Sequence, residues 1–224
     1  MFKTIQPHEI KDNSSLITKS FQLRKKVFSD QLGWDVPVIG DQEFDAYDGP
    51  NASYLVWASD DGETLYGVVR LMATNGPTLL HDVFHATHGR NPELIAADVW
   101  EGTRMCVDEG AVARDFPDMP AAHGFNLLFT ALCEAALAHN IRRLVSNFEP
   151  CMSRVYRRCG LKYDLHGRSD IYGKKPVYCA SFEVSPQVLR EMRAKVGVDM
   201  PVYQKSRTFS PLVAAALEPM KVSV

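Results

Sequence analysis

The chain has 224 residues, of which 46% are hydrophobic and 23% charged, proportions typical of a globular protein with one substantial core. No stretch approaches the roughly 18 consecutive apolar residues that a membrane span requires, and the first residues lack the apolar run of a secretory signal, so a cytoplasmic protein without membrane contact is expected. Five cysteines without a CxxC spacing argue against a disulfide framework and against a cysteine-ligated metal site.

The net charge is only −2, but the charges are unevenly distributed along the chain. Nine acids and no Lys or Arg lie from Asp30 to Glu63, whereas nine Lys or Arg and three acids lie from Arg142 to Lys175. Such segregation suggests two charged partners of opposite sign, unless both segments are simply solvated surface. The basic stretch is short and carries no recognised nucleic-acid-binding motif, so a nucleic-acid partner is not expected.

The first predicted element is a helix over Ser14–Asp30, which begins at a serine cap. Arg24 lies on this helix between Phe21, three residues before it, and Phe28, four residues after it, on a partly apolar face. A guanidinium there must either snorkel outward or meet a carboxylate, because an unpaired buried charge is too costly.

The next segment, residues 35–51, has no period and several breakers, which predicts a long ordered loop or lid. Two strands follow, Ser53–Ser59 and Thr64–Ala73, joined as a hairpin by an acidic turn that contains a glycine. A short helical turn is expected around Leu80–His85, and another strand is expected at Val99–Asp108.

The second half of the chain predicts a long helix from about Ala121 to His139, followed by a core strand at Ile141–Phe148. A short helix at Cys151–Cys159 follows. A strand at Val177–Val184 and a helix near Pro186–Lys195 complete the predicted core.

The order of these elements predicts an α/β fold, a three-layer α-β-α sandwich with a mixed central sheet. Residues 1–199 are expected to form a single domain. Residues 200–224 are expected to be a docking helix or a loose tail.

Ten positions spread over about 80 residues resemble the signature of the bacterial acyl-homoserine-lactone (autoinducer) synthases. They are Arg24, Phe28, Trp34, Glu43, Asp45, Asp48, Arg70, Phe84, Glu101 and Arg104. The matching stretches are FQLRKKVFSDQLGW (21–34), DQEFDAYD (41–48), VVRLM (68–72), HDVF (81–84) and WEGTRMCVD (100–108), and the resemblance extends over roughly residues 2–185. It implies a fold similar to the N-acetyltransferases. It also implies a reaction that joins S-adenosylmethionine to an acyl thioester and releases methylthioadenosine and a quorum-sensing lactone.

The residue types suit S-adenosylmethionine, which presents a sulfonium, an α-amine and an α-carboxylate. The acid-rich loop can complement the positive groups, the arginines can brace those acids or bind the carboxylate, and the aromatic rings can face the adenine and the sulfonium. The expected S-adenosylmethionine-binding residues are Arg24, Phe28, Trp34, Asp45, Asp48, Arg70 and Arg104. S-adenosylmethionine is a substrate here, so neither a cofactor nor a metal is expected. A purely structural ion-pair network is the alternative interpretation.

The candidate catalytic residues are Glu101, Arg104, Glu43 and Asp45. Glu101, or one of the other two acids through water, can accept the proton of the amine, and backbone N–H groups of a splayed strand can stabilise the oxyanion. Glu101 and Arg104 are three residues apart, so a regular strand would point them to opposite faces. A shared site therefore predicts a bulge or kink at Gly102–Thr103.

Acyl carrier protein, the acyl donor expected for many members of this family, is acidic and needs a basic dock. The candidate dock residues are Arg142, Arg143, Arg154, Arg157, Arg158 and Lys162. Phosphates of coenzyme A would also bind such a patch. However, no Gly-rich pyrophosphate loop lies between Asp108 and Gly124, which favours the carrier protein over acyl-CoA.

The acyl chain is expected in an apolar tunnel between the sheet and the long helix. Its candidate wall residues are Phe84, Met105, Phe125, Leu128, Leu144, Ser146 and Phe148. A hydroxyl such as that of Ser146, near the β-carbon, could favour an oxidised chain. Core packing would explain the same residues equally well.

Three histidines resemble a metal-binding motif. His81, His85 and His88 have the spacing of helical metal ligands, but Asp82 replaces the general base of an HExxH motif, so a surface turn with three exposed histidines is expected.

Two alternative functions remain open. The main one is an N-acyltransferase that uses acyl-CoA and another amine, and the other is a non-enzymatic ligand-binding module.

Overall fold

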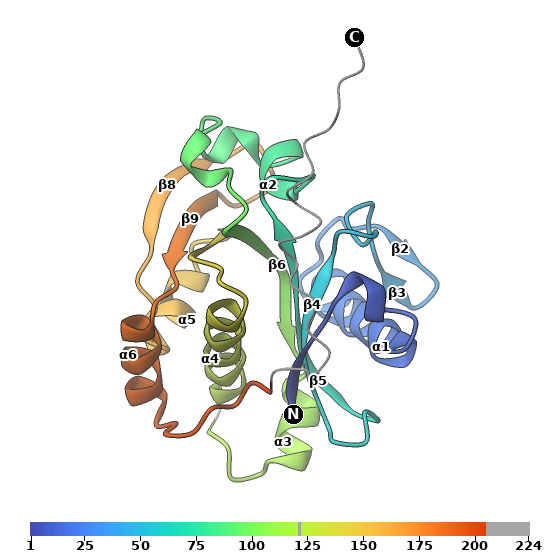
Figure 1. Ribbon diagram of the computed structural model, residues 1–224. Coiled ribbons are helices and arrows are strands. Elements are labelled where there is room, and N and C mark those ends of the chain that lie inside the picture. Colours follow the sequence, from blue (N-terminus) through green and yellow to red (C-terminus); the bar gives the residue numbers. More distant parts are fainter. Residues whose placement is uncertain (121, 205–224) are drawn as a thin grey trace.

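A mixed seven-stranded sheet divides the protein into two helical layers in the computed structural model, which describes residues 1–120 and 122–204 (Figure 1). The strand order is β1-β4-β5-β6-β7-β9-β8, and only the β6–β7 pair is parallel. The strands are β1 (Phe2–Ile5), β4 (Ser53–Ala58), β5 (Leu65–Ala73), β6 (Val99–Val107), β7 (Arg143–Phe148), β8 (Asp164–Ser169) and β9 (Val177–Glu183). The predicted α-β-α sandwich with a mixed sheet is confirmed.

One face of the sheet carries α1 (Ser14–Arg24) and the short α2 (Leu79–Asp82), together with a small hairpin of β2 (Val38–Ile39) and β3 (Gln42–Glu43). The opposite face carries the remaining helices. They are α3 (Glu109–Asp115), α4 (His123–Ala138), α5 (Met152–Arg158) and α6 (Pro186–Val196). Four further single turns connect these elements: 3-10 turns at Pro7–Glu9, His85–Thr87 and Pro92–Leu94, and a π-helical turn at Lys25–Gln31.

Each sheet face is buried by its own apolar cluster. Residues of α4 such as Leu128 pack with Leu144, Phe148 and Trp57 under the helical layer of α3 to α6. On the other face, Leu16 and other α1 residues pack with strand residues of β1, β4 and β5. This burial is the main stabilising force of the sandwich, because removing apolar surface from water contributes about 25 cal/mol per Å².

The helix ends follow the chemistry of their terminal residues. Ser185 caps α6 by accepting a hydrogen bond from the N–H of Val188 (3.2 Å), and Gly197 ends the helix with a φ of +74°. Asn140, which follows the long helix α4, has a φ of +56°, a conformation that asparagine tolerates better than most residues.

Besides the small β2–β3 hairpin, which lies where a loop was expected, and the single 3-10 turns, three elements were absent from the expectations. The edge strands β1 and β8 are short or polar, as the sequence DLHGRS of β8 shows, so they lack the apolar alternation that identifies a strand. The third is α3, a helix of only seven residues. The outer edge of β1 is covered by the chain near Tyr203, where the N–H of Gln204 donates to the carbonyl of Phe2 (3.0 Å).

Most of the expected tail, from residue 205 to residue 224, lies outside the described residues. Within the described part of the chain, no helix is both long enough and apolar enough to cross a membrane.

Candidate active site

Arg24 ends α1 and is completely buried, and it meets carboxylates as expected. Its Nε donates to Glu43 Oε2 (2.6 Å), and its two terminal nitrogens donate to the two carboxylate oxygens of Asp48 (2.7 and 2.8 Å). The hydroxyl of Tyr54 on β4 donates to the same carboxylate (2.7 Å). The guanidinium carbon also lies 5.0 Å from the ring centre of Phe21, so the charge is both paired and stacked.

Arg70 on β5 holds the next acid of the loop. Its terminal nitrogens donate to both oxygens of Asp45 (2.6 and 3.1 Å), and its Nε donates to Thr103 Oγ1 (3.0 Å). Arg104 on β6 then joins the two halves, because it donates to Glu43 Oε1 (3.1 Å) and to Asp45 Oδ2 (3.0 Å).

The result is a closed network of three arginines and three carboxylates whose formal charges cancel. Burial alone would raise the pKa of Asp48, but the hydrogen bonds and charge of Arg24 outweigh it and hold that pKa well below its usual range. Burial would lower the pKa of Arg24, yet its bonds to Asp48 and Glu43 raise it instead. Arg24 and Asp48 therefore stay ionised at physiological pH.

Members of this network differ in how far they reach the surface. The side chains of Arg24 and Glu43 are 0% exposed and that of Asp48 is 3% exposed, whereas those of Asp45 and Arg104 are 10% and 12% exposed. Arg24 and Asp48 therefore lie beneath the surface, where they hold the exposed members of the network in position. Asp45 and Arg104 remain within reach of a substrate.

The predicted irregularity in β6 exists, but two residues later than expected. Gly102 pairs regularly with Leu71 and Thr103 with Arg70, and the register then shifts so that two β6 residues, Arg104 and Met105, lie opposite the single β5 residue Val69. Arg104 sits in this bulge with a φ of +53°. The prediction of a bulge at Gly102–Thr103 was therefore wrong in position. The left-handed residue is the arginine itself, because its two bonds, one to Glu43 and one to Asp45, compensate for the backbone strain.

The bulge brings Glu101 and Arg104 to the same face of the sheet. Glu101 pairs with Met72 and Thr103 pairs with Arg70, so these residues point to the side where Arg70 binds Asp45. Without the bulge, Arg104 would point into the cluster beneath α4. Glu101 and Arg104 therefore lie on one face of the sheet, as a shared site would require.

Glu101 stands outside the ion-pair network. It is 0% exposed, and neither of its carboxylate oxygens has a hydrogen-bond partner in the described part of the chain. Burial raises its pKa to about 7, although the nearby backbone N–H groups of Leu80 and Leu79, at the start of α2, and the charge of Arg70 act to lower it. A carboxyl with this pKa exchanges protons readily near neutral pH.

Two residues of this region were missed by the sequence analysis. Tyr47 donates from its hydroxyl to Asp82 of α2 (3.2 Å) and lies under the guanidinium of Arg70 (5.9 Å), so it ties the acid loop to α2. Thr103 anchors the Nε of Arg70. Neither belongs to the charged set that the sequence singled out, although Tyr47 lies inside the DQEFDAYD stretch.

An aromatic pair lies beside the network. Phe28 and Trp34 stack with ring centres 5.1 Å apart, and Arg104 lies over Phe28 (5.7 Å). The π-helical turn at Lys25–Gln31 rotates Phe28 away from Arg24, which an α-helix would have placed beside it. Phe28 is buried and Trp34 is 38% exposed, so the outer ring remains available for a flat ligand.

The expected acyl-chain residues divide between the two faces of the sheet. Leu128, Leu144 and Phe148 are buried in the cluster beneath α4, and Met105 and Phe125 pack against it. Ser146 lies where β6 and β7 part and donates to the carbonyl of Gly102 (2.9 Å).

Phe84 does not join the other wall residues. It follows α2 on the opposite face of the sheet and packs edge-on against Tyr172, with ring centres 5.0 Å apart. Its place in a common wall with Leu128 is therefore wrong, because α2 packs through Leu80 against Val145, whose side chain points away from α4.

The six basic residues expected to form one dock are also divided. Arg142 is paired with Asp98 (2.8 Å) and Lys162 with Glu191 (3.3 Å). Arg143 points to the sheet face opposite α5, since its neighbour Leu144 lies beneath α4. The single six-residue patch was thus wrong. The part that stays together on one exposed helix is Arg154, Arg157 and Arg158 of α5.

The three histidines are not all exposed, as had been expected. His88 is 6% exposed and its Nε2 lies 3.0 Å from the carbonyl oxygen of Leu80, while His81 is half-buried with its ring 5.6 Å from that of His88. His85 alone is exposed. Because α2 ends at Asp82, the three do not share one helical face.

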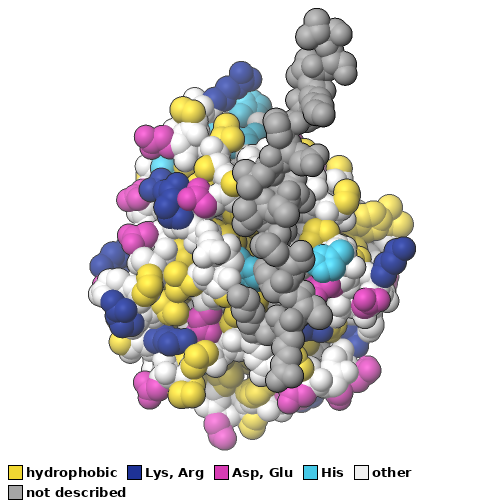
Figure 2. Space-filling model, in the orientation of Figure 1, with side chains coloured by type: hydrophobic (Ala, Val, Ile, Leu, Met, Phe, Trp, Pro, Cys, Tyr) yellow, Lys and Arg dark blue, Asp and Glu magenta, His cyan; other side chains and the backbone are white. Residues whose placement is uncertain are grey.

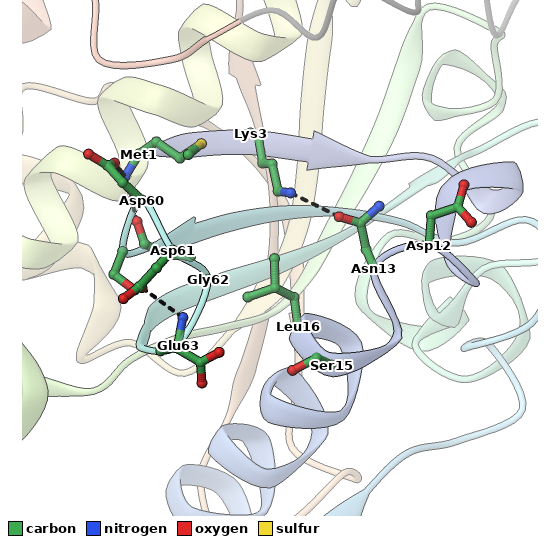
Figure 3. A pocket seen from close by; sticks show the side chains of 12 residues that line it. Met1, Lys3, Asp12, Asn13, Ser15, Leu16, Asp60, Asp61, Gly62 and Glu63 are labelled. Carbon is green, nitrogen blue, oxygen red and sulfur yellow. Dashed lines mark hydrogen bonds and ion pairs between the residues drawn. The ribbon is translucent and has the colours of Figure 1, made fainter.

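Two surface features lie outside the network. The β2 residues Val38 and Ile39 are exposed apolar side chains, 38% and 66% exposed. Apolar side chains gather at the edge of the molecule over this hairpin (Figure 2). A cavity of about 250 Å³ lies between β1, the start of α1 and the β4–β5 turn, lined by acids such as Asp12 and Asp61 and by Lys3, which donates to Asn13 (2.8 Å; Figure 3). None of the expected site residues lines this cavity.

Comparison with known proteins adds an independent line of argument. A family model described as autoinducer synthase matches residues 8–192. An acyl-homoserine-lactone synthase of Agrobacterium fabrum is 30% identical over 188 residues, which cover 80% of this chain and 88% of that protein. One of Ralstonia solanacearum is 31% identical over 169 residues, which cover 72% of this chain and 78% of that protein.

Solved structures share the fold. The CoA-dependent acyl-homoserine lactone synthase BjaI, with SAM and isopentyl-CoA, superposes with a TM-score of 0.81 at 21% identity and covers 96% of this chain and 98% of its own. The synthase LasI superposes with a TM-score of 0.72 at 21% identity, covering 88% and 93%. A protein of Lactobacillus plantarum described as an N-acetyltransferase has a TM-score of 0.51 at 19% identity, covering 82% and 99%.

Proposed function

Because this chain belongs to the autoinducer synthase family and is an acyltransferase that makes acyl-homoserine lactones, we propose that it transfers an acyl group from acyl carrier protein to S-adenosylmethionine. The observation that carries the proposal is the contrast within the site. Asp45 and Arg104 belong to a charge-balanced network, while Glu101 on the same face is buried, unpaired and close to neutral pH in its titration.

S-adenosylmethionine fits the exposed side of this network. Asp45 offers a carboxylate to the α-amine or the sulfonium, Arg104 offers a guanidinium to the α-carboxylate, and Trp34 offers a ring face to the adenine. The buried ion pairs of Arg24 hold these groups in place before the substrate arrives, which reduces the entropic cost of binding. S-adenosylmethionine is consumed as a substrate, and we propose no separate cofactor.

Glu101 is the residue best suited to act as the base. Its carboxyl has a pKa raised by burial to about 7, and it has no competing ion pair, whereas Glu43 and Asp45 are each held by two arginines. The neutral amine attacks the thioester carbonyl carbon, and the π electrons move to oxygen. As the C–S bond breaks, the amine proton passes to Glu101 and then to the leaving thiolate.

Lactone formation follows within the same bound molecule. A carboxylate oxygen attacks the γ-carbon, the C–S bond to the sulfonium breaks, and its electron pair returns to sulfur as neutral methylthioadenosine. No proton moves in this step. The protein contributes mainly by holding the carboxylate near the γ-carbon, and Arg104 is placed to do so.

The choice of acyl carrier protein as donor rests on the exposed arginines of α5, Arg154, Arg157 and Arg158, and on the absence of a Gly-rich pyrophosphate loop between residues 108 and 124 of the sequence. The second candidate donor is an acyl-CoA. It is favoured by the fold shared with BjaI, a synthase described as CoA-dependent.

The experiment supplies S-adenosylmethionine with matched acyl groups of four to sixteen carbons on either carrier protein or coenzyme A. Mass spectrometry follows lactone and methylthioadenosine together. We expect both products, and we expect kcat/KM to be higher with the carrier protein as donor than with coenzyme A. The double variant Arg154→Glu, Arg157→Glu should lower kcat/KM for the carrier-protein donor alone. No lactone from any donor contradicts the proposal, and acylation of another amine instead supports a plain N-acyltransferase. Equal loss with both donors would remove α5 as the dock.

A further inference from the structure

Asn147 lies next to Glu101 at the point where two strands separate. The parallel pair β6–β7 is joined only from Val99 to Glu101, which pairs with Val145, and beyond that point the strands part. Asn147 is two residues further along β7, so its side chain points to the same face as Val145 and Glu101. Glu101 and Asn147 thus lie on one face of the sheet, on neighbouring strands, where the backbone pairing of those strands ends.

The Asn147 amide is fixed at one end and unused at the other. Its Oδ1 accepts a hydrogen bond from Thr87 Oγ1 (2.8 Å), and Thr87 is 1% exposed. Its Nδ2 is buried and has no hydrogen-bond partner among the residues that the structure describes. An amide N–H left without a partner in the protein interior is unfavourable, and a bound substrate that accepts its hydrogen bond would remove that cost.

Glu101 shows the complementary deficit. Both of its oxygens are buried and unpartnered, and the Asn147 amide lies close enough to the carboxyl to help lower its pKa without making a hydrogen bond to it. The neighbouring hydroxyl of Ser146 is already used on the carbonyl of Gly102. A buried donor, Asn147 Nδ2, and a buried acceptor, the Glu101 carboxyl, thus lie near each other, and neither has a hydrogen-bond partner among the described residues.

We propose that Asn147 is a catalytic residue whose Nδ2 donates to the thioester carbonyl oxygen during acylation. This inference rests on the proposed function, in which Glu101 receives the proton of the attacking amine. The attacked carbon must lie about 3–3.5 Å from that amine, and the carbonyl oxygen lies only about 1.2 Å from this carbon. Charge develops on this oxygen in the transition state, and a preoriented N–H in a water-poor site stabilises it more there than in the ground state.

The experiment compares Asn147→Leu, which keeps the volume and removes both polar ends, with Asn147→Asp, which keeps the acceptor for Thr87 and removes the donor. Loss of one oxyanion donor typically lowers kcat about 10²–10³-fold, and we expect this for both variants with an unsubstituted acyl thioester. Binding of S-adenosylmethionine, measured by calorimetry, should stay close to wild type. Thr87→Val, which frees the amide to rotate, should give an intermediate loss.

Thr4→Val is the matched control, because it removes a buried hydrogen bond (2.9 Å to Tyr203) at the far edge of the sheet and should leave kcat unchanged. Wild-type kcat in both Asn147 variants would overturn the inference. A loss of kcat seen only with C3-oxidised acyl chains would also overturn it, because Asn147 would then recognise the C3 oxygen of the chain. If the acid limb of the pH–rate profile shifts in Asn147→Leu while the maximal rate is unchanged, Asn147 is a positioning residue for Glu101 and not a catalytic residue.

If Asn147→Leu fails to fold, Asn147→Asp, which preserves the bond to Thr87, carries the test. Failure of the proposed function has a different signature. The wild-type protein itself would then make no lactone from any donor, and this inference would fall with it.

Discussion

Replacing Glu101 by glutamine should stabilise the protein while abolishing its turnover. The pKa of this carboxyl is raised from an ordinary 4.5 to about 7 by burial, so the fold favours the protonated form. Its contribution to stability is therefore complete below the unfolded-state pKa and is lost as the pH rises towards and beyond 7. Glutamine has a similar shape and never ionises, so it avoids that loss.

The size of the effect follows from the shift. A difference from 4.5 to about 7 corresponds to about 3 kcal/mol at 1.36 kcal/mol per pKa unit. For a chain of this size that is roughly 6–12 °C in Tm at about pH 8, falling to a small fraction at about pH 5. The charge of Arg70 acts to lower the pKa of this carboxyl, and Glu101 in turn helps to raise the pKa values of its neighbours Tyr47 and Cys179.

The assay is calorimetric or circular-dichroism melting of wild type and Glu101→Gln at both pH values, alongside lactone production. Glu134→Gln is the control, because Glu134 is also buried but binds Arg193 (2.8 Å) and accepts the N–H groups of Val202 and Tyr203. It should lower the Tm at both pH values. A Tm difference for Glu101→Gln that is the same at both pH values would refute the reasoning.

Three further predictions concern the same site. In wild type, kcat/KM should rise with pH along a limb centred near the pKa of about 7, and a limb centred at about pH 5 would exclude Glu101 as the base. Arg24→Leu leaves Glu43 with only Arg104 and Asp48 with only Arg70, so the buried network carries one uncompensated negative charge. Chemical denaturation should therefore show a loss of about 3–5 kcal/mol, and a near-neutral result would contradict the bracing role. Trp34→Ala should weaken S-adenosylmethionine binding roughly tenfold in calorimetry while hardly changing the Tm, because that ring is 38% exposed; unchanged affinity would remove the ring from the binding site.

Much of the fold could be predicted because its central elements carry strong periodic signals. The β4–β5 hairpin and α4 appear close to the expected bounds, and so does β9. The edge strands β1 and β8 could not be predicted in the same way, because an edge strand is covered on fewer sides and its residues need not alternate.

Parts of the site could not be predicted from the local sequence pattern. The strand bulge falls on Arg104 and not on the more permissive Gly102, because ion pairs to a distant loop stabilise a backbone conformation that the local sequence disfavours. The π-helical turn that places Phe28 beside Arg104, and not beside Arg24, could likewise not be predicted from the local sequence. The basic residues looked like one patch in sequence, yet strand alternation turned Arg143 away from α5.

The sequence by itself determined the chemistry available: arginines, acids and aromatics at a family-specific spacing, and the requirement that Arg24 find carboxylates. Only the tertiary structure decided which of these groups neutralise one another and which remain unpaired. Glu101 and Asn147 become notable through burial without partners, a property that depends on residues far apart in the chain, such as Thr87 and Arg70. Desolvation and pairing are set by the whole fold, and so are the pKa values and unused donors on which the proposed chemistry depends.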